Sequence, residues 1–206
     1  MIRSALTTDS TSLAKLHAET LTTSFLASLG FKFLNRLYTF LIQTEKVWVY
    51  EENDIIKGFV SYSGNSAEMM KRFLINRPAC IVSLVLKTIV QPANFKRFVE
   101  TFKASYKSQK SNDIISLPSG ELLSISVSPD CQASGIGSQL VKVLEEYLQQ
   151  NEITNYKVVA GAELLGANKF YVKNGFVLAT QIKIHGEMLS NVYIKKIEVK
   201  DKVAVA

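Results

Sequence analysis

The sequence predicts a single α/β domain, and three observations support this prediction. An apolar run typical of a strand, 122–127, leads through a glycine-containing loop into a helix-like run, 140–148. About thirty residues later, a second strand-like run, 157–160, precedes a short helix-like segment that Gly175 ends. Of the 206 residues 47% are hydrophobic, and the chain has no Pro/Gly/Ser-rich linker and no internal repeat. We therefore expect one domain over 1–206.

The remaining elements follow from periodicity and turn chemistry. The N-terminal third contains a predicted strand at 2–6, a helix capped by Thr8-Asp9-Ser10, a helix at 30–42, and a hairpin of strands 47–50 and 55–63 turning at Glu52-Asn53-Asp54. The C-terminal end adds two predicted strands, 177–184 and 188–194. Helices and strands thus alternate irregularly, as in a mixed α/β fold.

The segment from about 66 to 112 differs in charge from the rest of the chain. It holds nine Lys and Arg against two Glu, a net charge of +7, in a chain whose net charge is +6. Its apolar positions predict two or three amphipathic helices around Pro78 and Pro92. Three interpretations stay open: a helical cover with a solvated lysine-rich face, a lid that recruits an anionic acceptor, or an attachment to a membrane surface.

The loop Gln132-Ala133-Ser134-Gly135-Ile136-Gly137-Ser138 carries the clearest chemical signal. A turn of this kind between a strand and a helix directs several backbone N–H groups at one anion. Gly135 and Gly137 supply the backbone freedom that a close approach of phosphate needs. No P-loop Gly-Lys-Ser/Thr follows, and Leu140 stands where the dinucleotide fingerprint has its third glycine. We predict a phosphate site that needs no metal ion.

The Gln-x-x-Gly-x-Gly loop is followed by Ala167-Asn168-Lys169-Phe170-Tyr171-Val172-Lys173-Asn174-Gly175-Phe176. These two motifs, in this order and at this spacing, resemble the GNAT superfamily of acetyl-CoA-dependent N-acyltransferases. The resemblance covers about 119–197, and before that only the order of elements agrees. It implies a mostly antiparallel central sheet that is splayed between strands four and five, with the 66–112 segment as a helical insert. It also implies that a connection at about 22–30 contributes to the acceptor pocket.

The resemblance assigns the cofactor site. The backbones of Ile125 and Val127 would pair with the pantetheine arm of acetyl-CoA, and the Val127 N–H would polarise the thioester carbonyl. The amides of Gln132, Ala133, Ser134, Gly135, Ile136, Gly137 and Ser138 would hold the pyrophosphate. The side chain of Asn168 would hydrogen-bond the cofactor arm.

Tyr171 occupies the position from which many GNAT members protonate the departing thiolate. Its phenol suits this role because it stays protonated at neutral pH. The alternative is an aromatic side chain that only packs on the sheet. The sequence departs from the family at Leu164, where many members carry an asparagine seven residues before the tyrosine.

Glu121 is the candidate general base. It lies eleven residues before Gln132, a spacing at which the histone acetyltransferase branch of the family places its glutamate base. Strand alternation predicts that Glu121 shares one face with Leu123, Ile125 and Val127, where burial would raise its pKa. The alternative is a glutamate at the strand edge in water, with no dedicated side-chain base in the enzyme.

Other candidates are weaker. His185 and Glu187, near the predicted turn between the last two strands, would contact the acceptor or shuttle a proton if they are more than surface residues. His17, on the apolar side of the first helix, is predicted to be structural. Cys131 adjoins the loop, but no His or Asp partner is arranged around it in sequence, so we expect no acetyl-cysteine.

We therefore expect an N-acetyltransferase that uses acetyl-CoA and a primary amine in a ternary complex. The leading acceptor is a small molecule such as an amino sugar or a nucleotide-linked amino sugar. The alternatives are a protein amine acetyltransferase, or a non-catalytic acyl-CoA-binding module that docks through its basic helices.

Partners and location follow from what the sequence lacks. Two cysteines, Cys80 and Cys131, are too few for a disulfide framework, and no Cys/His metal-ligand spacing occurs. The N-terminus is unlike a signal peptide, and the apolar run 80–90 is too short to span a bilayer. We expect a cytoplasmic protein that binds no metal and no nucleic acid. Further expectations are a homodimer, and a contact of residues 66–112 with a membrane surface or an anionic ligand.

Overall fold

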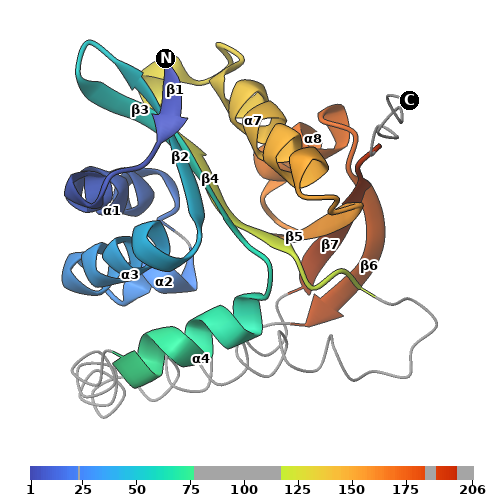
Figure 1. The fold of residues 1–206 in the computed structure, drawn as a ribbon. Helices are drawn as coiled ribbons and strands as arrows, with labels where there is room; N and C mark the ends of the chain where they lie inside the picture. Colours follow the sequence, from blue (N-terminus) through green and yellow to red (C-terminus); the bar gives the residue numbers. More distant parts are fainter. Residues whose placement is uncertain (23, 77–116, 184–188, 199–206) are drawn as a thin grey trace, which may run out of the picture.

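A seven-stranded sheet organises the computed structural model, which describes residues 1–22, 24–76, 117–183 and 189–198. The strands lie in the order β1-β2-β3-β4-β5-β7-β6 (Figure 1). Their bounds are β1 Ile2–Ser4, β2 Lys46–Glu52, β3 Ile55–Ser63, β4 Glu121–Val127, β5 Asn155–Gly161, β6 Val177–Lys183 and β7 Leu189–Lys196. The described helices are α1 Ser10–Thr20, α2 Phe25–Ser28, α3 Phe31–Thr44, α4 Ser66–Asn76, α7 Ile136–Gln150 and α8 Leu165–Lys173, with short 3-10 turns at Thr7–Asp9 and Pro129–Cys131.

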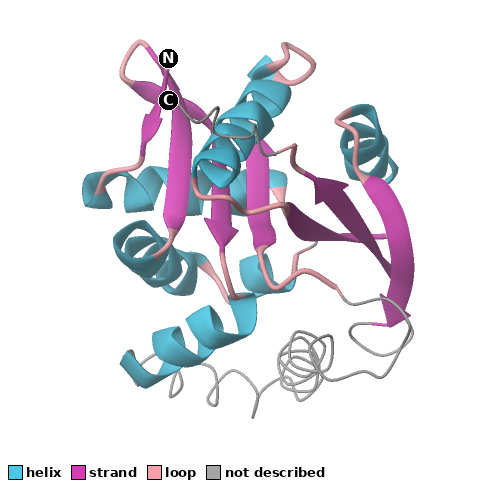
Figure 2. Ribbon diagram, turned by 45° about the vertical axis from the view of Figure 1, so that its right-hand side comes forward, coloured by secondary structure: helices cyan, strands magenta, loops and turns pink. Residues whose placement is uncertain are grey.

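Helices cover both faces of the sheet, as Figures 1 and 2 show. On one face α1, α3 and α4 enclose a core that includes Leu34, Phe59 and Phe73. On the other face α7 and α8 enclose a second core that includes Leu144 and Tyr156. Alternation along the strands supplies both cores, since successive side chains point to opposite faces. The predicted α/β class is therefore confirmed.

The sheet opens in its middle, as the family resemblance implies. β4 and β5 are the parallel pair, and all other neighbouring strands are antiparallel. These two strands pair at two positions, Glu121 with Lys157 and Leu122 with Val158. Beyond these two pairs β4 and β5 separate. The edge of β4 that points away from β3 therefore faces a gap between the two strands. The predicted splay between strands four and five is confirmed.

A β-bulge in β4 corrects one sequence expectation. Ser61 pairs with Ser124 and Tyr62 pairs with Leu122, so Leu123 is an extra residue on β4. Leu123 packs against the α1/α3 core, whereas Ile125 and Val127 pack against the α7 core. Strict alternation had predicted these side chains on one face together with Glu121. The bulge separates them, because one additional residue shifts every later side chain to the other face.

The N-terminal region agrees with the predicted elements but not with the predicted cap. Asp9 precedes α1, yet its carboxylate makes no capping hydrogen bond to that helix. Instead it accepts hydrogen bonds from the Leu6 N–H at 2.7 Å and from the Arg3 guanidinium at 2.7 Å. The charged partner next to the strand is the stronger donor, so Asp9 ties β1 to α1.

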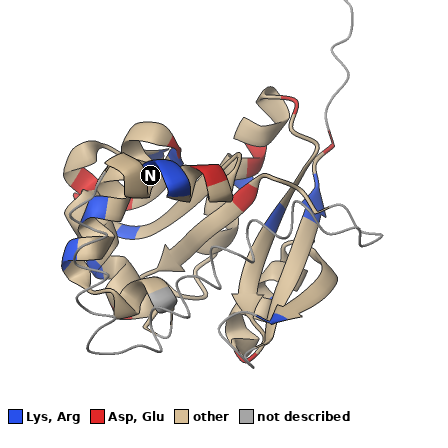
Figure 3. Cartoon of the chain, turned by 90° about the horizontal axis from the view of Figure 1, so that it is seen from below, with Lys and Arg blue, Asp and Glu red and all other residues tan. Residues whose placement is uncertain are grey.

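The described part of the basic segment is α4, which packs Met69 and Phe73 on the sheet. The rest of the predicted insert, and with it His185 and Glu187, lies outside the described residues. In Figure 3 basic and acidic residues are interspersed over the described chain. In this part of the chain, no helix is long and apolar enough to cross a membrane.

Candidate active site

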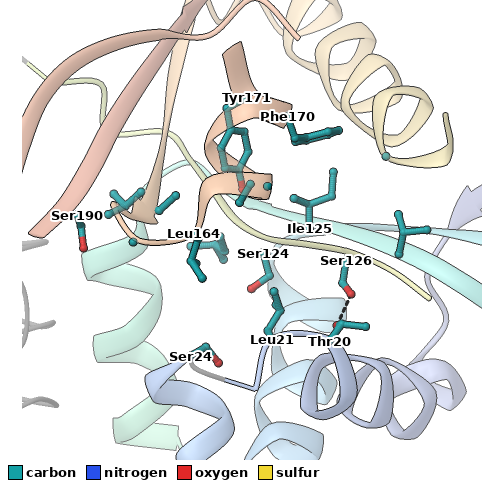
Figure 4. A pocket seen from close by; sticks show the side chains of 18 of the residues that line it. Thr20, Leu21, Ser24, Ser124, Ile125, Ser126, Leu164, Phe170, Tyr171 and Ser190 are labelled. Atoms are coloured by element: carbon teal, nitrogen blue, oxygen red, sulfur yellow. Dashed lines mark hydrogen bonds between the residues drawn. The ribbon is translucent and has the colours of Figure 1, made fainter. Parts of the chain in front are cut away.

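A cavity of about 860 Å³ occupies the place where β4 and β5 separate. It extends from α1 and α2 on one face of the sheet to the N-terminal end of α7 and to α8 on the other. Figure 4 shows Tyr171 and Phe170 at one end, Ile125 and Ser124 of β4 in the middle, and Ser24 at the opposite end. A cavity that passes through a sheet in this way can bring two different molecules together from two sides.

The predicted phosphate loop presents free amides to this cavity. Gly135 has φ +89° and Ala133 has φ +61°, so two residues near the start of α7 adopt the left-handed region. Among the described residues, no hydrogen bond uses the backbone N–H groups of 133–138 as donors. Amides without protein acceptors at the N-terminus of a fifteen-residue helix can hold an anion, so the phosphate site stays a prediction that this geometry allows.

Gly137 is needed here for space. A β-carbon at this position would lie 3.0 Å from Cε2 of Phe170, a ring that also lines the cavity. Gly135 differs, because a β-carbon there would meet no atom within 4 Å and only the backbone conformation requires glycine. The two glycines therefore act for different physical reasons, one for packing and one for its φ.

The free edge of β4 agrees with the role assigned to Ile125 and Val127. The Ser128 N–H donates to the Lys57 carbonyl at 2.8 Å, next to the register pair of Gly58 and Val127. Hydrogen-bonded and non-hydrogen-bonded pairs alternate along an antiparallel ladder. The N–H and C=O groups of Val127 and Ile125 therefore point away from β3 and toward the gap. An extended ligand arm could hydrogen-bond there as an added strand.

Tyr171 has the properties that a proton donor in this cavity needs. Its side chain is 6% exposed and directs its hydroxyl toward the cavity (Figure 4). Burial raises the pKa of Tyr171, so the phenol keeps its proton at neutral pH. Among the described residues the hydroxyl has no hydrogen-bond partner in the protein. It is therefore available to a ligand.

Asn168 holds the wall of the cavity together. Its Nδ2 donates to the carbonyls of Gly161 at 2.9 Å and Leu164 at 2.8 Å. Its Oδ1 accepts from Nδ2 of Asn191 at 2.8 Å and from the Tyr193 hydroxyl at 2.9 Å. The amide is thus fully engaged with the protein. Its contact with the cofactor stays a prediction, whereas its geometry gives it a structural role at the start of α8.

Glu121 lines the cavity next to Ser66, the first residue of α4. Its Oε2 accepts a hydrogen bond from the Ser66 hydroxyl at 2.6 Å and lies 3.6 Å from Nζ of Lys157. Lys157 is 5% exposed and also donates to the Pro118 carbonyl at 2.5 Å. The surroundings of Glu121 are therefore a hydroxyl and an ammonium group rather than the apolar neighbours that the sequence predicted.

The opposite end of the cavity holds His17, which the sequence predicted to be a structural residue of the first helix. His17 is 1% exposed, its Nδ1 lies 2.7 Å from the Tyr38 hydroxyl, and its Nε2 lies 2.9 Å from Oγ of Ser24. Oγ of Ser24 also accepts from the Ala27 N–H at 3.1 Å. Burial lowers the pKa of His17 to about 4, so the imidazole is neutral at neutral pH. The predicted structural position is confirmed, but its polar contacts were not predicted.

The surroundings of Cys131 do not favour a nucleophilic role. Burial, together with the Asp130 carboxylate, raises the pKa of the Cys131 thiol, which disfavours the nucleophilic thiolate. Of the residues assigned to the cofactor, Ser134 and Asn168 are outside the lining of this cavity. Within the described ranges no group of His, Cys, Asp or Glu is placed to hold a metal ion.

Comparison with known proteins agrees with this geometry. The family model described as "Acetyltransferase (GNAT) domain" matches residues 98–178, a range that includes β4, the loop, α7, β5 and α8. No match to a curated protein was found. The resemblance drawn from the two sequence motifs is therefore confirmed by an independent comparison.

Solved structures share the fold at low sequence identity. The N-acetyltransferase from Staphylococcus aureus Mu50 is 16% identical, with a TM-score of 0.59 over 96% of this chain and 98% of that one. The ribosomal-protein-S18-alanine N-acetyltransferase from Escherichia coli is 13% identical, with a TM-score of 0.60 over 98% and 97%. An acetyltransferase of the GNAT family from Streptococcus pneumoniae is 16% identical, with a TM-score of 0.57 over 96% and 99%. At these identities the likeness concerns the fold.

Proposed function

We propose that this chain, in which residues 98–178 match the acetyltransferase (GNAT) domain model, transfers the acetyl group of acetyl-CoA to a primary amine of a small molecule. The observation that carries the proposal is the cavity through the splayed sheet, which has free amides at one side and a separate polar end at the other. An amino sugar or a nucleotide-linked amino sugar is the leading acceptor class.

The residues present fit acetyl-CoA. The amides of 133–138, at the positive end of α7, suit a pyrophosphate without a metal ion. The backbone edge at Ile125 and Val127 faces the gap and suits the amide groups of a pantetheine arm, although Nε2 of Gln132 donates to the Val127 carbonyl at 3.3 Å. When bound, acetyl-CoA supplies the activated acetyl group. The Val127 N–H then stabilises negative charge on the carbonyl oxygen.

Two side chains manage protons in this proposal. Tyr171 donates its hydroxyl proton to the departing sulfur, a role that its burial and its free hydroxyl support. Glu121 accepts a proton from the amine, directly or through a water molecule. Its position in the lining of the cavity, beside Lys157, supports this role.

The polar end of the cavity supports a hydroxylated acceptor. Hydroxyl groups line the cavity from its middle to this end: Ser124 and Ser126 on β4, Thr20 on α1 and Ser24 in the α1–α2 connection, with the Thr20 and Ser126 hydroxyls hydrogen-bonded to each other. Hydroxyl groups both donate and accept hydrogen bonds, so such a lining suits a neutral polyhydroxylated molecule better than a second charged group. This lining, rather than the basic segment, now supports the choice of an amino sugar.

The test is acetyl-CoA-dependent thiol release by the purified protein against a panel of amines, including amino sugars and their nucleotide conjugates. We expect release with at least one amino sugar, and loss of release in Gly135→Glu, whose carboxylate would occupy the anion site. Tyr171→Phe should keep acetyl-CoA affinity and lose turnover by about 10²-fold, the usual contribution of a positioned acid. Tight acetyl-CoA binding without release on the whole panel would refute the proposal and favour an acyl-CoA-binding module.

A protein amine is the second candidate acceptor. It is favoured by the fold similarity to the Escherichia coli enzyme named for the alanine of ribosomal protein S18. A peptide with an N-terminal alanine belongs in the same panel. Release with this peptide and with no amino sugar would replace the first candidate by the second.

A further inference from the structure

We propose that Lys157 binds an oxygen atom of the acceptor beside the reacting amine, so that the enzyme selects amines with a hydroxyl group on the neighbouring carbon. The inference rests on the proposed acetyl transfer, with Glu121 as the group that receives the amine, and it deepens that proposal by naming the substrate class. Lys157 on β5 is the register partner of Glu121 on β4, where the two strands still pair. Both residues line the cavity.

Lys157 is a buried ammonium group with hydrogen-bond donors to spare. The residue is 5% exposed, and its Nζ donates to the Pro118 carbonyl at 2.5 Å. Oε2 of Glu121 lies 3.6 Å from Nζ, which is too far for a direct hydrogen bond. An ammonium group has three N–H donors, and the described residues supply no further acceptor. Because an unmatched buried donor is costly, Nζ favours an oxygen atom of a ligand in the cavity.

Glu121 offers the complementary group next to this ammonium. Its Oε2 accepts from the Ser66 hydroxyl at 2.6 Å and is the oxygen that faces Lys157. Its Oε1 accepts no hydrogen bond from the described residues, and it is not closed off from solvent. A carboxylate only accepts hydrogen bonds and an ammonium group only donates them. The pair therefore presents one acceptor and one donor side by side.

A molecule with an amine and a hydroxyl group on adjacent carbons matches this pair. In the staggered gauche form its nitrogen and oxygen lie about 3 Å apart, close to the 3.6 Å between Nζ and Oε2. The amine can then donate to Glu121 while the hydroxyl oxygen accepts from Lys157. A carboxylate on the acceptor would also suit Lys157, but it would lie beside the carboxylate of Glu121 and be repelled. Within the leading acceptor class the pair thus favours a 2-amino sugar, whose amine has a hydroxyl group on each neighbouring carbon.

Lys157→Met is the direct test, because methionine fills a similar space and lacks the ammonium group. Lys195→Met is the matched control, since Nζ of Lys195 pairs with Glu145 at 2.5 Å outside the cavity. Lys157→Met leaves the Glu121 carboxylate without its cation, which endangers folding. A second comparison avoids the unpaired charge: Glu121→Gln alone against Glu121→Gln combined with Lys157→Met. Urea unfolding checks that each variant is folded.

The probes are two isomeric amines, trans-2-aminocyclohexanol and trans-4-aminocyclohexanol, which differ in the distance between amine and hydroxyl. The measurement is the ratio of their kcat/KM values in acetyl-CoA-dependent thiol release. We expect Lys157→Met to lower the preference for the 2-isomer about tenfold or more, the value of a hydrogen bond to a charged group. Lys195→Met should keep the wild-type ratio. Comparing ratios between proteins cancels the different reactivities of the two amines.

The outcomes separate this inference from the proposed function. An equal ratio in the wild type and in folded Lys157→Met, or in the second pair of variants if Lys157→Met does not fold, would overturn the inference and leave acetyl transfer intact. Release by the wild type from glucosamine but from neither isomer would also overturn the inference alone, because the 2-isomer carries both groups. No release from glucosamine or from either isomer would overturn the proposed function and the inference together.

Discussion

Acidification should destabilise this protein through His17. Folding lowers the pKa of this imidazole from 6.5 to about 4, because the folded chain buries it. Between these values the unfolded chain binds a proton that the folded chain does not. Stability therefore rises with pH across this window, and it is lost as the pH falls from about 6.5 towards about 4.

The magnitude follows from the separation of the two pKa values. Each tenfold difference in proton affinity corresponds to 1.36 kcal/mol, so His17 contributes about 3 kcal/mol of unfolding free energy at neutral pH that is absent near pH 4. This is a large share of the 5–15 kcal/mol that is typical of a folded domain. A single buried side chain would thus dominate the acid limb of the stability curve.

The assay is urea unfolding of the wild type and of His17→Gln at closely spaced pH values from 4 to 8. Glutamine does not titrate, and other titrating groups, such as Asp9, are common to both proteins. At pH 8 the wild type should be more stable by about 1 kcal/mol, since glutamine loses the hydrogen bond to Tyr38. The difference should shrink and reverse in sign as the pH falls below about 5.5. Two curves that stay parallel over the whole range would refute a neutral, buried His17.

The remaining predictions concern the cofactor side of the cavity. Gly135→Ala should lower stability by about 1 kcal/mol in urea unfolding through its φ of +89°, yet keep acetyl-CoA binding by calorimetry, because its β-carbon has free space. Glu121→Gln should lower turnover about 10²-fold with acetyl-CoA affinity unchanged; unchanged turnover would make Glu121 a structural partner of Lys157. Asn168→Ala should cost about 1–3 kcal/mol, since it removes the acceptor that the Asn191 amide and the Tyr193 hydroxyl share; calorimetric unfolding identical to wild type would contradict this.

Local chemistry made the loop predictable from sequence. Gly135 and Gly137 stand between a strand and a helix, and the amides that they expose belong to neighbouring residues. Gly175 is a similar case, because its φ of +81° ends α8 as the sequence predicted. Such features depend on a few consecutive residues, so a single sequence contains them.

Features that depend on distant partners could not be predicted. His17 contacts Tyr38 and Ser24 only after α1 and α3 have packed together. The sequence of α1 alone shows only that His17 lies on the apolar face of that helix. Because of the bulge at Leu123, the side chains of Glu121 and Ile125 lie on opposite faces of β4. A bulge of this kind cannot be predicted from the alternation of residues along the strand. The sequence alone suggests that Lys157 is an exposed charge, whereas the parallel pairing of β4 with β5 places it beside Glu121.

The two hydrophobic cores on opposite faces of the sheet bear on how this protein could change over evolution. Tyr38, the hydrogen-bond partner of His17, belongs to the core of α1 and α3, whereas Ile136 of the predicted phosphate loop and Tyr171 belong to the core of α7 and α8. Substitutions in distant, non-contacting sites are close to additive in their effects. Substitutions in the core of α1 and α3 could therefore change the preferred acceptor, while binding of the acetyl donor stays unchanged.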